Sequence, residues 1–469
     1  MERSSSQAIS REGAGSLPFS FAGIRLAPWV ALVAGAFAVA ALTLLFPSAP
    51  TYDPWAWIIW GREIAHLDLQ TTGGPSWKPL PVLFTTVFSL FGSIAPALWL
   101  VVARAGALLC LVAAFFLVRR LNGGWVGGIV AVAGIAMAPW FMRNAAYGNS
   151  EPLLVALLLG AVEREFAGHH KVAFGLAVGA ALLRPEVWPF LAVYSLWLVY
   201  KRQIPWAWVA GAGIAVIALW TLPELWGSGD PLRAADRAQQ PNADAATFAD
   251  HPALQVFKNT GEMLTIPVMA GLATLLGLGA YRRDWRALGL FAFAVAWVTL
   301  VAIMTSRGGF SGNNRYLIPA VSIFIVLAGT GFGWAARLMP ARAAIPAAVV
   351  LVVAVSWVGA GRLDKTLNAI KYQSTLVNAL PGLVEDAGGA KKLRDCGDPY
   401  TGPFLVPAVA WYMHVHTLDV GLKPKAPAVV FRERTDNGVR RKVVPPMYEV
   451  TGRNLALAPN WRLVGECRK

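Results

Sequence analysis

Residues 52–81 read YDPWAWIIWGREIAHLDLQTTGGPSWKPLP, and they follow the first long apolar segment of the chain. The stretch begins with an acid, Asp53, continues as a tryptophan-rich amphipathic segment and ends with Lys78 among prolines. A connection between two membrane spans needs only a turn and some polar residues. An acid, aromatic rings and fixed cations at the boundary of lipid and water instead favour chemistry on a lipid-linked substrate.

The composition of the chain is typical of a membrane protein. Of its 469 residues, 56% are hydrophobic and only 14% are charged, and the mean hydropathy is +0.51. A soluble domain of this length carries more charge, whereas uncharged runs of about 20 residues indicate transmembrane helices. The net charge is +15, but the cations stand mostly at the ends of apolar runs. This pattern indicates membrane topology and lipid headgroups, and it argues against a nucleic-acid partner.

We predict a mainly α-helical, polytopic bundle of about eleven spans with a small C-terminal α/β domain. The predicted spans are 26–46, 97–118, 124–142, 150–164, 172–184, 187–200, 205–222, 262–281, 287–306, 316–336 and 343–361. A signal peptide removed after the first run is the alternative to a retained first span. The domains are a leader (1–25), a transmembrane domain (26–361) with a catalytic first outer loop (47–81), and a soluble domain (362–469).

The distribution of basic residues predicts the orientation. Basic loops and the leader fall on one side, which the positive-inside rule makes cytoplasmic. An odd number of spans then places the C-terminal domain outside the cytoplasm. High use of Ala, Gly, Arg and Trp favours a GC-rich bacterium, so we expect a multi-pass protein of the plasma (inner) membrane.

Two predicted spans are too short to cross a bilayer comfortably. The runs 172–184 and 187–200 meet at Arg184-Pro185-Glu186, between cationic flanks. We expect the pair to rise to a vertex that holds Arg184 and Glu186 at membrane depth, where ionisable groups face a cavity or a partner. A mutual ion pair at a helix break is the simpler interpretation of the same two residues.

The C-terminal segment has more charge and short β-like runs, which predict a folded soluble domain. The expected strands are 403–415, 427–434 and 440–450, with a Thr-Asp-Asn-Gly turn between the last two. Cys396 and Cys467 both lie in this domain, so an extracytoplasmic location predicts a disulfide, with two free thiols as the alternative. His414 and His416 would share one strand face as a surface pair.

Asp53 has two interpretations. Asp followed by Pro is a good helix start, with the acid as N-cap and Pro54 as the first helical residue. The surrounding tryptophans, Trp55, Trp57 and Trp60, predict a helix that lies along the membrane surface and carries the acid at its beginning. In that setting the carboxylate is available for chemistry.

Two other outer-face residues also have structural alternatives. Glu151 could serve as the acid in the first turn of a helix capped by Ser150, and Arg315 could be an interface anchor beside Tyr316. Arg104 stands a few residues inside a span, so we expect it to pair internally.

The order of these parts resembles the GT-C superfamily of polyprenyl-phosphate-sugar-dependent glycosyltransferases, in particular the aminoarabinose-transferase and protein-mannosyltransferase branch. The resemblance covers roughly residues 26–340 and rests on the ordered series, because no single motif is specific. The residues that carry it are Tyr52-Asp53, Trp60-Gly61-Arg62-Glu63-Ile64, Lys78-Pro79-Leu80-Pro81, Leu90-Phe91-Gly92, Ala103-Arg104, Arg119-Arg120-Leu121, Ser150-Glu151-Pro152-Leu153, Leu183-Arg184-Pro185-Glu186 and Asn314-Arg315-Tyr316-Leu317.

The resemblance implies a membrane glycosyltransferase, hexosyl or pentosyl, that moves a sugar from a polyprenyl-phosphate donor to an extracytoplasmic glycan, lipid or protein acceptor with inversion. We expect Asp53 to act as the catalytic base. Cations would neutralise the donor phosphate as the glycosidic bond breaks, and further residues would bind the acceptor or the sugar. The expected phosphate ligands are Lys78, Arg62 and Arg315, and the expected acceptor or sugar ligands are Glu151, Arg184 and Glu186.

We expect no cofactor and no metal. Some relatives place two adjacent carboxylates after the first span, but Pro54 follows Asp53 here, which leaves one. His66 and Asp68 would complete a divalent-metal site only if the loop folded back. The alternative functions are a non-catalytic membrane scaffold or partner subunit, and a lipid or solute transporter. A transporter typically has internal repeats and polar residues near the midplane.

Overall fold

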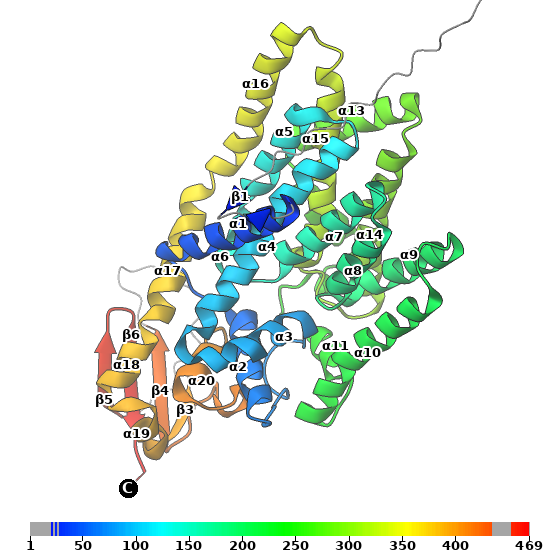
Figure 1. Ribbon diagram of the computed structural model, residues 1–469. Coiled ribbons are helices and arrows are strands. Elements are labelled where there is room, and N and C mark those ends of the chain that lie inside the picture. The colour runs from blue at the N-terminus through cyan, green and yellow to red at the C-terminus, as the bar shows by residue number, and fades with distance from the viewer. Residues whose placement is uncertain (1–19, 22–23, 26–27, 434–451, 469) are drawn as a thin grey trace, which may run out of the picture.

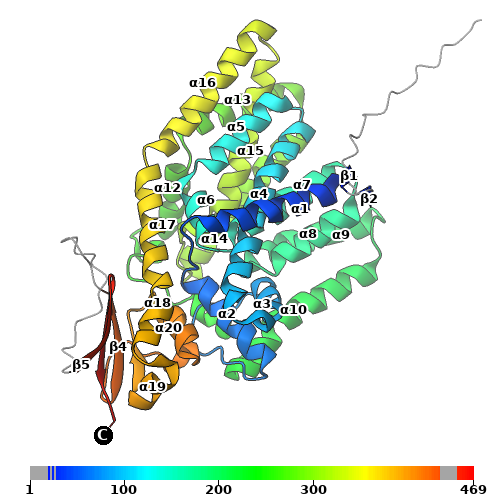
Figure 2. The same ribbon diagram turned by 60° about the vertical axis from the view of Figure 1, so that its left-hand side comes forward.

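The computed structural model describes residues 20–21, 24–25, 28–433 and 452–468. Figure 1 shows an elongated bundle of helices, with a small sheet at the end that also carries the C-terminus. Figure 2 shows helices α18, α19 and α20 between this sheet and the bundle. The predicted fold class, a helical bundle followed by a small α/β domain, is therefore confirmed.

The described part of the chain up to the end of the bundle consists mostly of helices. In chain order its elements are β1 (Ser20–Phe21), β2 (Ile24–Arg25), α1 (Pro28–Leu42), η1 (Thr43–Leu45), α2 (Tyr52–Ala65), α3 (Pro79–Phe88), η2 (Ser89–Ile94), α4 (Ala95–Arg120), α5 (Gly124–Ala136), α6 (Pro139–Ala146), α7 (Glu151–Phe166), α8 (His170–Ala181), η3 (Pro185–Val187), α9 (Trp188–Tyr200), α10 (Trp206–Ser228), α11 (Arg233–Ala238), η4 (Ala246–Phe248), α12 (Pro252–Met263), α13 (Ile266–Arg282), α14 (Trp285–Arg307), η5 (Asn314–Tyr316), α15 (Ile318–Ala336) and α16 (Ala341–Ala360).

Five helical stretches of the described chain are long and apolar enough to cross a bilayer, so the protein is a multi-pass membrane protein. The number rises to seven when two bent pairs, α5 with α6 and α12 with α13, are each counted as one span. Helices α7, α8 and α9 have only 16, 12 and 13 residues. The predicted count of eleven depends on such short helices, and it stays a prediction.

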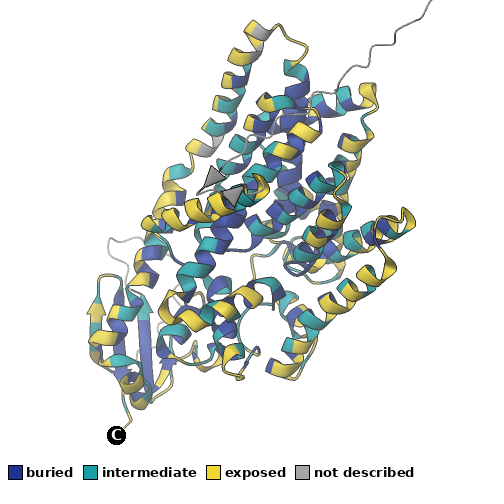
Figure 3. Cartoon of the chain, in the orientation of Figure 1, coloured by how far each residue is buried: buried dark blue, intermediate teal, exposed yellow. Residues whose placement is uncertain are grey.

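The core of the bundle lies around α15. In its apolar stretch 89% of the residues are buried, whereas in that of α10 only 11% are buried. Figure 3 shows the same contrast between the buried centre and the exposed outer helices. Small residues permit close helix contact here: a Cβ added to Gly329 of α15 would lie 2.5 Å from the carbonyl oxygen of Gly127 in α5. Backbones that approach this closely gain packing contacts that do not depend on water.

The tryptophan-rich stretch after the first span forms α2 as predicted, but its environment differs from the prediction. Trp55, Trp57 and Trp60 are all buried, and Trp57 packs edge-on against Trp99 of α4. Protein and not lipid therefore covers these tryptophans, because α3, α4 and α20 pack on α2, and the position of α2 along the membrane surface stays a prediction. An aromatic pair of this kind adds about 0.5–1.5 kcal/mol beyond the area that it buries.

The paired short helices confirm the predicted break. Helix α8 ends at Ala181, η3 covers Pro185–Val187, and α9 starts at Trp188. Arg184 and Glu186 are both buried at this vertex.

The described part of the C-terminal domain combines four α-helices, one short 3-10 helix and four strands. Its elements are α17 (Leu363–Asn378), α18 (Leu380–Asp386), α19 (Gly389–Cys396), β3 (Asp398–Tyr400), α20 (Val406–Met413), η6 (Thr417–Asp419), β4 (Ala428–Glu433), β5 (Arg453–Ala458) and β6 (Trp461–Glu466). The sheet order is β3-β4-β6-β5, with β3 parallel to β4 and the other pairs antiparallel. Val430 of β4 pairs with Val464 of β6 at the centre of the buried face.

Two of the expected strands can be compared with the structure. The run 427–434 forms β4, but 403–415 forms helix α20, so that strand prediction is wrong. The run consists of apolar residues that suit either a strand or a buried helix, and periodicity cannot distinguish the two at this length. The expected strand 440–450 and the turn before it lie outside the described residues.

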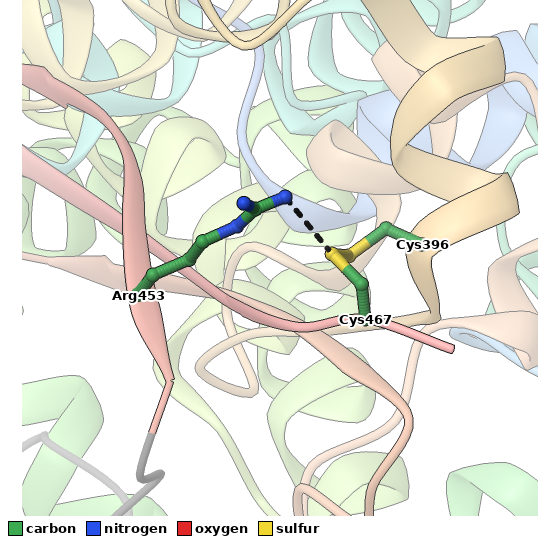
Figure 4. Close-up of a disulfide and its surroundings, with 3 residues drawn as sticks. All are labelled: Cys396, Arg453 and Cys467. Carbon is green, nitrogen blue, oxygen red and sulfur yellow. Dashed lines mark hydrogen bonds between the residues drawn. A yellow bond between two sulfur atoms is a disulfide. The ribbon is translucent and has the colours of Figure 1, made fainter. Parts of the chain in front are cut away.

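A disulfide joins the end of α19 to the end of β6. Figure 4 shows the bond between Cys396 and Cys467, with the guanidinium of Arg453 3.9 Å from the Cys467 sulfur. The predicted bridge is confirmed, and the free-thiol alternative is excluded. The third cysteine, Cys110, is buried in α4 as a free thiol.

Candidate active site

Arg315 connects two acids from distant parts of the chain. Its Nη1 donates to Asp53 Oδ2 at 2.8 Å, across 262 residues of sequence. Its Nε and Nη2 donate to the carboxylate of Glu151, with distances to Oε1 of 3.0 Å and 2.9 Å. The side chain of Glu151 is fully buried, while Asp53 and Arg315 remain partly exposed. Asp53 and Arg315 form the accessible edge of a charged cluster, and Glu151 lies buried behind them.

Lys78 joins the cluster from the start of α3. Its Nζ donates to Ser150 Oγ at 2.9 Å, lies 3.8 Å from Glu151 Oε1, and lies 5.1 Å from the centre of the Trp57 ring. Burial, together with the charges of Arg184 and Arg315, lowers the pKa of Lys78 to about 7, although Glu151 and Asp53 oppose the shift. The positive charge of the buried Lys78 ammonium is therefore only partly balanced by the neighbouring carboxylates.

The vertex between α8 and α9 supplies the deepest part of the cluster. Arg184 Nη2 donates to Glu151 Oε1 at 2.6 Å, and Nη1 donates to Glu186 Oε1 at 3.4 Å. The guanidinium of Arg184 also lies 4.4 Å from the centre of the Tyr316 ring. Both interpretations of the vertex hold, because Arg184 pairs with its neighbour Glu186 and also faces the partner Glu151.

Two buried polar atoms at this vertex have no hydrogen-bond partner among the described residues. They are Nε of Arg184 and Oε2 of Glu186. Buried polar atoms are nearly always paired, and an unpaired one costs roughly 1–3 kcal/mol. The two atoms therefore retain hydrogen-bonding capacity for a polar ligand.

The local sequence explains how the acids are presented. Thr51 is the N-cap of α2 and Asp53 lies in its first turn, so the expectation of Asp53 as N-cap is wrong. Glu151 is the first residue of α7 after Ser150, as the structural alternative stated, but the Ser150 hydroxyl accepts from Lys78 instead of capping the helix. Acids in a first helical turn are stabilised by the backbone dipoles.

Six of the seven predicted site residues meet in this cluster: Asp53, Lys78, Glu151, Arg184, Glu186 and Arg315. Three cations and three carboxylates thus face one another. Arg62 does not take part, because its Nη1 and Nη2 donate to the carbonyls of Trp411 and Val415, at 3.4 Å and 2.8 Å. The expected role of Arg62 as a phosphate ligand is therefore dropped. Arg104 pairs internally, as expected, with oxygens of Thr43, Ser48 and Ala146.

Sequence reasoning missed a second buried ion pair that supports the site. Glu224 is fully buried near the end of α10, and Arg233 of α11 donates to both of its carboxylate oxygens. Arg233 Nη2 also donates to the Pro75 carbonyl at 2.8 Å, which fixes the turn before Lys78. The sequence signal for this ion pair was Glu224, an acid that follows Pro223 inside an apolar run. Ionisable residues inside such runs usually have a specific partner.

The two possible metal ligands of the first outer loop have other partners. His66 Nδ1 bonds the carbonyl oxygen of Arg62 at 2.7 Å, and Asp68 lies 3.4 Å from His416 Nε2. Within the described part of the chain, no three His, Cys, Asp or Glu side chains are grouped to hold a metal ion.

The fold has known counterparts. No family model and no curated protein matches the sequence. The crystal structure of ArnT from Cupriavidus metallidurans in the apo state superposes with a TM-score of 0.60, covering 93% of this chain and 97% of that chain at 14% identity. The same protein bound to undecaprenyl phosphate gives 0.57, with the same coverage and 15% identity. An oligosaccharyltransferase of Archaeoglobus fulgidus, in complex with Zn and sulfate, gives 0.49 over 86% of this chain and 68% of that chain at 12% identity.

The ArnT match defines the fold along almost the whole chain. ArnT is an aminoarabinose transferase with the GT-C fold. The predicted resemblance is thus confirmed at the level of the fold, which this chain shares with ArnT over almost its whole length.

Proposed function

We propose that the protein is a membrane glycosyltransferase that moves a sugar from a polyprenyl-phosphate donor to an acceptor outside the cytoplasm. The observation that carries the proposal is the cluster of Asp53, Glu151, Arg315 and Lys78, assembled from four separate segments of the chain. The fold supports it, because one ArnT structure with this fold is bound to undecaprenyl phosphate. The sugar is a hexose or a pentose, and the acceptor is a glycan, lipid or protein.

Lys78 and Arg315 bind the donor phosphate in this proposal. Glycosyl transfer from such a donor builds negative charge on the departing phosphate, and cations held in place stabilise that charge in the transition state. Lys78 is buried and Arg315 is partly exposed, so together they span the depth of the cluster. No metal is needed for this neutralisation, since two fixed cations already face the phosphate.

Asp53 acts as the base. In the ligand-free arrangement its carboxylate bonds Arg315. A phosphate that binds Arg315 competes for that guanidinium and releases Asp53 to accept the proton of the acceptor hydroxyl. The hydroxyl oxygen then attacks the anomeric carbon from the face opposite the phosphate, the bond from that carbon to the phosphate oxygen breaks, and the configuration inverts.

Glu151, Arg184 and Glu186 bind the sugar or the acceptor. Glu151 is surrounded by three cations, which fixes its carboxylate in position. The unpaired Arg184 Nε and Glu186 Oε2 add one donor and one acceptor, which suits a hydroxyl-rich ligand.

Sugar transfer tests the proposal directly. Membranes that contain the wild type or Asp53→Asn receive radiolabelled polyprenyl-phosphate sugars, and label that passes to endogenous glycan, lipid or protein is measured. We expect transfer by the wild type and a loss of at least about a hundredfold in Asp53→Asn, the usual contribution of a general base. Asp244→Asn, an exposed acid of another outer loop, is the matched control and keeps full activity.

Each contrary result has a defined meaning. Full transfer by Asp53→Asn would remove the base assignment and direct attention to Glu151. No transfer by the wild type with any donor, at normal expression and folding, would contradict the enzymatic proposal and favour a scaffold or a transporter.

A further inference from the structure

The side of α2 that faces away from the cluster is held by the C-terminal domain. Arg62 donates to the carbonyls of Trp411 and Val415, and its guanidinium lies 5.1 Å from the centre of the Trp411 ring. Trp55 packs against the rings of Trp411 and Tyr412, with centroids 6.0 Å and 5.7 Å apart. Figure 1 shows α20 beside α2. The domain therefore contacts the helix that carries Asp53.

One ionisable group in this contact touches two acids at once. His416 Nδ1 lies 2.8 Å from Glu63 Oε1, and His416 Nε2 lies 3.4 Å from Asp68 Oδ2. A neutral imidazole has one N–H, so it would direct a lone pair at one of the two carboxylates. Only the doubly protonated ring is attracted to both, because it donates to Glu63 and forms an ion pair with Asp68. We name this arrangement, Glu63–His416–Asp68, the interdomain bridge.

The charged groups around the bridge come from every element packed there. Glu63 and Arg62 belong to α2, and Asp68 belongs to the loop after it. Asp419 of η6 accepts the backbone N–H of His416 at 2.9 Å. Arg394 and His414 of the C-terminal domain are also close enough to interact electrostatically, and His414 interacts with Arg62 as well. Three acids thus surround the ring of His416, and the guanidinium of Arg62 on the same helix as Glu63 is occupied by carbonyls.

The bridge also determines the path of the loop that leads to Lys78. The second oxygen of Glu63, Oε2, accepts the backbone N–H of Gln70 at 3.0 Å. Farther along, Gly73 lies directly on η6, because a Cβ added there would be 2.9 Å from the Leu418 nitrogen. The loop therefore contacts the C-terminal domain at Gly73, while Arg233 of α11 holds it at Pro75.

We propose that His416 is a positioning residue: its protonated ring ties the C-terminal domain to Glu63 and Asp68 and thereby holds the beginning of residues 66–77, the loop that leads to Lys78. When the ring loses its second proton this first part of the loop loosens, while Arg233 continues to hold the turn at Pro75. The structural part of this proposal stands alone, and only its effect on transfer rests on the proposed function.

The direction of the pH dependence follows from the surroundings. Burial lowers the pKa of His416, but the hydrogen bond and charge of Glu63, with Asp419 and Asp68, outweigh burial and raise it above its ordinary value of 6.5. Burial raises the pKa of Glu63 above 4.5. The bridge is therefore complete at pH values between the pKa of Glu63 and the pKa of His416. It is lost as the pH rises through the pKa of His416. The ring is 30% exposed, so solvent protons reach it.

Hydrogen exchange of the full-length protein in lipid nanodiscs tests the bridge without any substrate. Wild type, His416→Asn, His416→Lys and the matched control His414→Asn are compared at pH 6 and pH 8.5, with exchange times scaled for the intrinsic pH effect. Asn suits position 414, where the backbone is left-handed. Peptides that cover residues 66–77 report the outcome.

We expect His416→Asn to exchange at least about tenfold faster than wild type in residues 66–77 at pH 6, as the loss of a charge-assisted hydrogen bond implies. The wild type should approach the rate of this variant at pH 8.5. His416→Lys keeps its charge and stays protected at both values, and His414→Asn follows the wild type. A merely structural role of His416 would show no rescue by lysine and no dependence on pH.

Two results overturn the proposal. One is unchanged exchange of residues 66–77 in His416→Asn at pH 6, and the other is wild-type protection that is equal at the two pH values. The transfer assay is run on the same samples. Exchange that behaves as expected while the wild type transfers no sugar would leave the interdomain bridge in place and reject the proposed function alone.

Discussion

Arg315 shows how one side chain organises the candidate site. Its guanidinium bonds Asp53 with one nitrogen and Glu151 with two others, so the two acids are held at a set separation. Burial lowers its pKa, but the two carboxylates outweigh burial and raise it, so Arg315 remains charged throughout the physiological range. A fixed charge of this kind suits both the resting cluster and a bound phosphate.

Replacing Glu151 by glutamine tests the electrostatic balance of the cluster. The change leaves Lys78, Arg184 and Arg315 facing only Asp53 and Glu186. We expect a loss of about 3–5 kcal/mol in the free energy of unfolding, because removing one partner strands buried charge. Thermal unfolding in detergent measures it, with the Glu262→Gln variant at the end of α12 as control. Equal melting temperatures for the two variants would show that the cluster does not stabilise the fold.

The pH dependence of transfer tests Lys78. Its pKa of about 7 means that the ammonium is charged below pH 7 and becomes neutral as the pH rises through that value. The donor is a phosphodiester and does not titrate there, so kcat/KM for the donor should fall about tenfold per pH unit well above 7. Lys78→Arg should move this fall to higher pH.

Release of the interdomain bridge also acts above neutral pH, so the profile is measured in the His416→Lys background as well. We expect the fall near pH 7 to persist there, because Lys78 is unchanged. A flat profile in that background would assign the whole pH effect to His416 and remove the role of Lys78 as a charged donor ligand.

At the scale of elements, α2 is held between α3 on one side and the C-terminal domain on the other. Thr85 of α3 donates its hydroxyl to the Trp57 carbonyl at 2.7 Å, across a contact with Gly61 of α2. The close approach depends on the missing side chain of Gly61. The relative position of α2 and α3 matters because one carries Asp53 and the other starts after Lys78.

Gly61→Ala tests this contact. The new Cβ would lie 2.6 Å from the backbone oxygen of Thr85, so one helix must shift. We expect a destabilisation of about 1–3 kcal/mol and a loss of transfer, as overpacking of a tight contact implies. Gly175→Ala in α8 is the matched control, because nothing lies within 4 Å of its added Cβ. Identical melting temperatures and transfer rates in the two variants would contradict the tight contact.

At the scale of the whole molecule, the C-terminal domain is continuous with the site and is not a separate appendage. Ser48 donates its backbone N–H to Ser374 Oγ, and Arg62 bonds carbonyls of the domain. Two points of the segment 47–81, Ser48 and Arg62, are thus tied to the C-terminal domain. We therefore expect changes in the domain's stability to alter transfer.

The disulfide is the simplest way to change that stability. Cys396 and Cys467 are 71 residues apart, and a loop of this length gains about 4 kcal/mol from the reduced entropy of the unfolded chain. Cys396→Ser with Cys467→Ser should lower the melting temperature and abolish its sensitivity to reductant. Cys110→Ala should retain that sensitivity. A wild-type melting temperature that reductant does not change would contradict a stabilising role.

Part of the site was predictable from the sequence because the signals are local. Arg184 and Glu186 interrupt an apolar run, and Asp53 and Glu151 stand next to prolines at helix starts. Those patterns indicate acids and cations at the ends of spans. The roles assigned to Arg62 and to the tryptophans of α2 were not predictable, because they depend on which surface covers α2. That surface comes from residues about 350 positions later in the chain.

The sequence by itself determined that this is a multi-pass helical membrane protein with a small disulfide-bonded domain, because hydropathy and cysteine placement are properties of the chain alone. The tertiary structure decided the rest. It converted 403–415 from an expected strand into helix α20, it buried the tryptophans of α2, and it removed Arg62 from the site. It also brought Arg315 to Asp53 across 262 residues. The physical reason is that buried charges and aromatic rings are stabilised by the partners that surround them, and packing chooses those partners from the whole molecule.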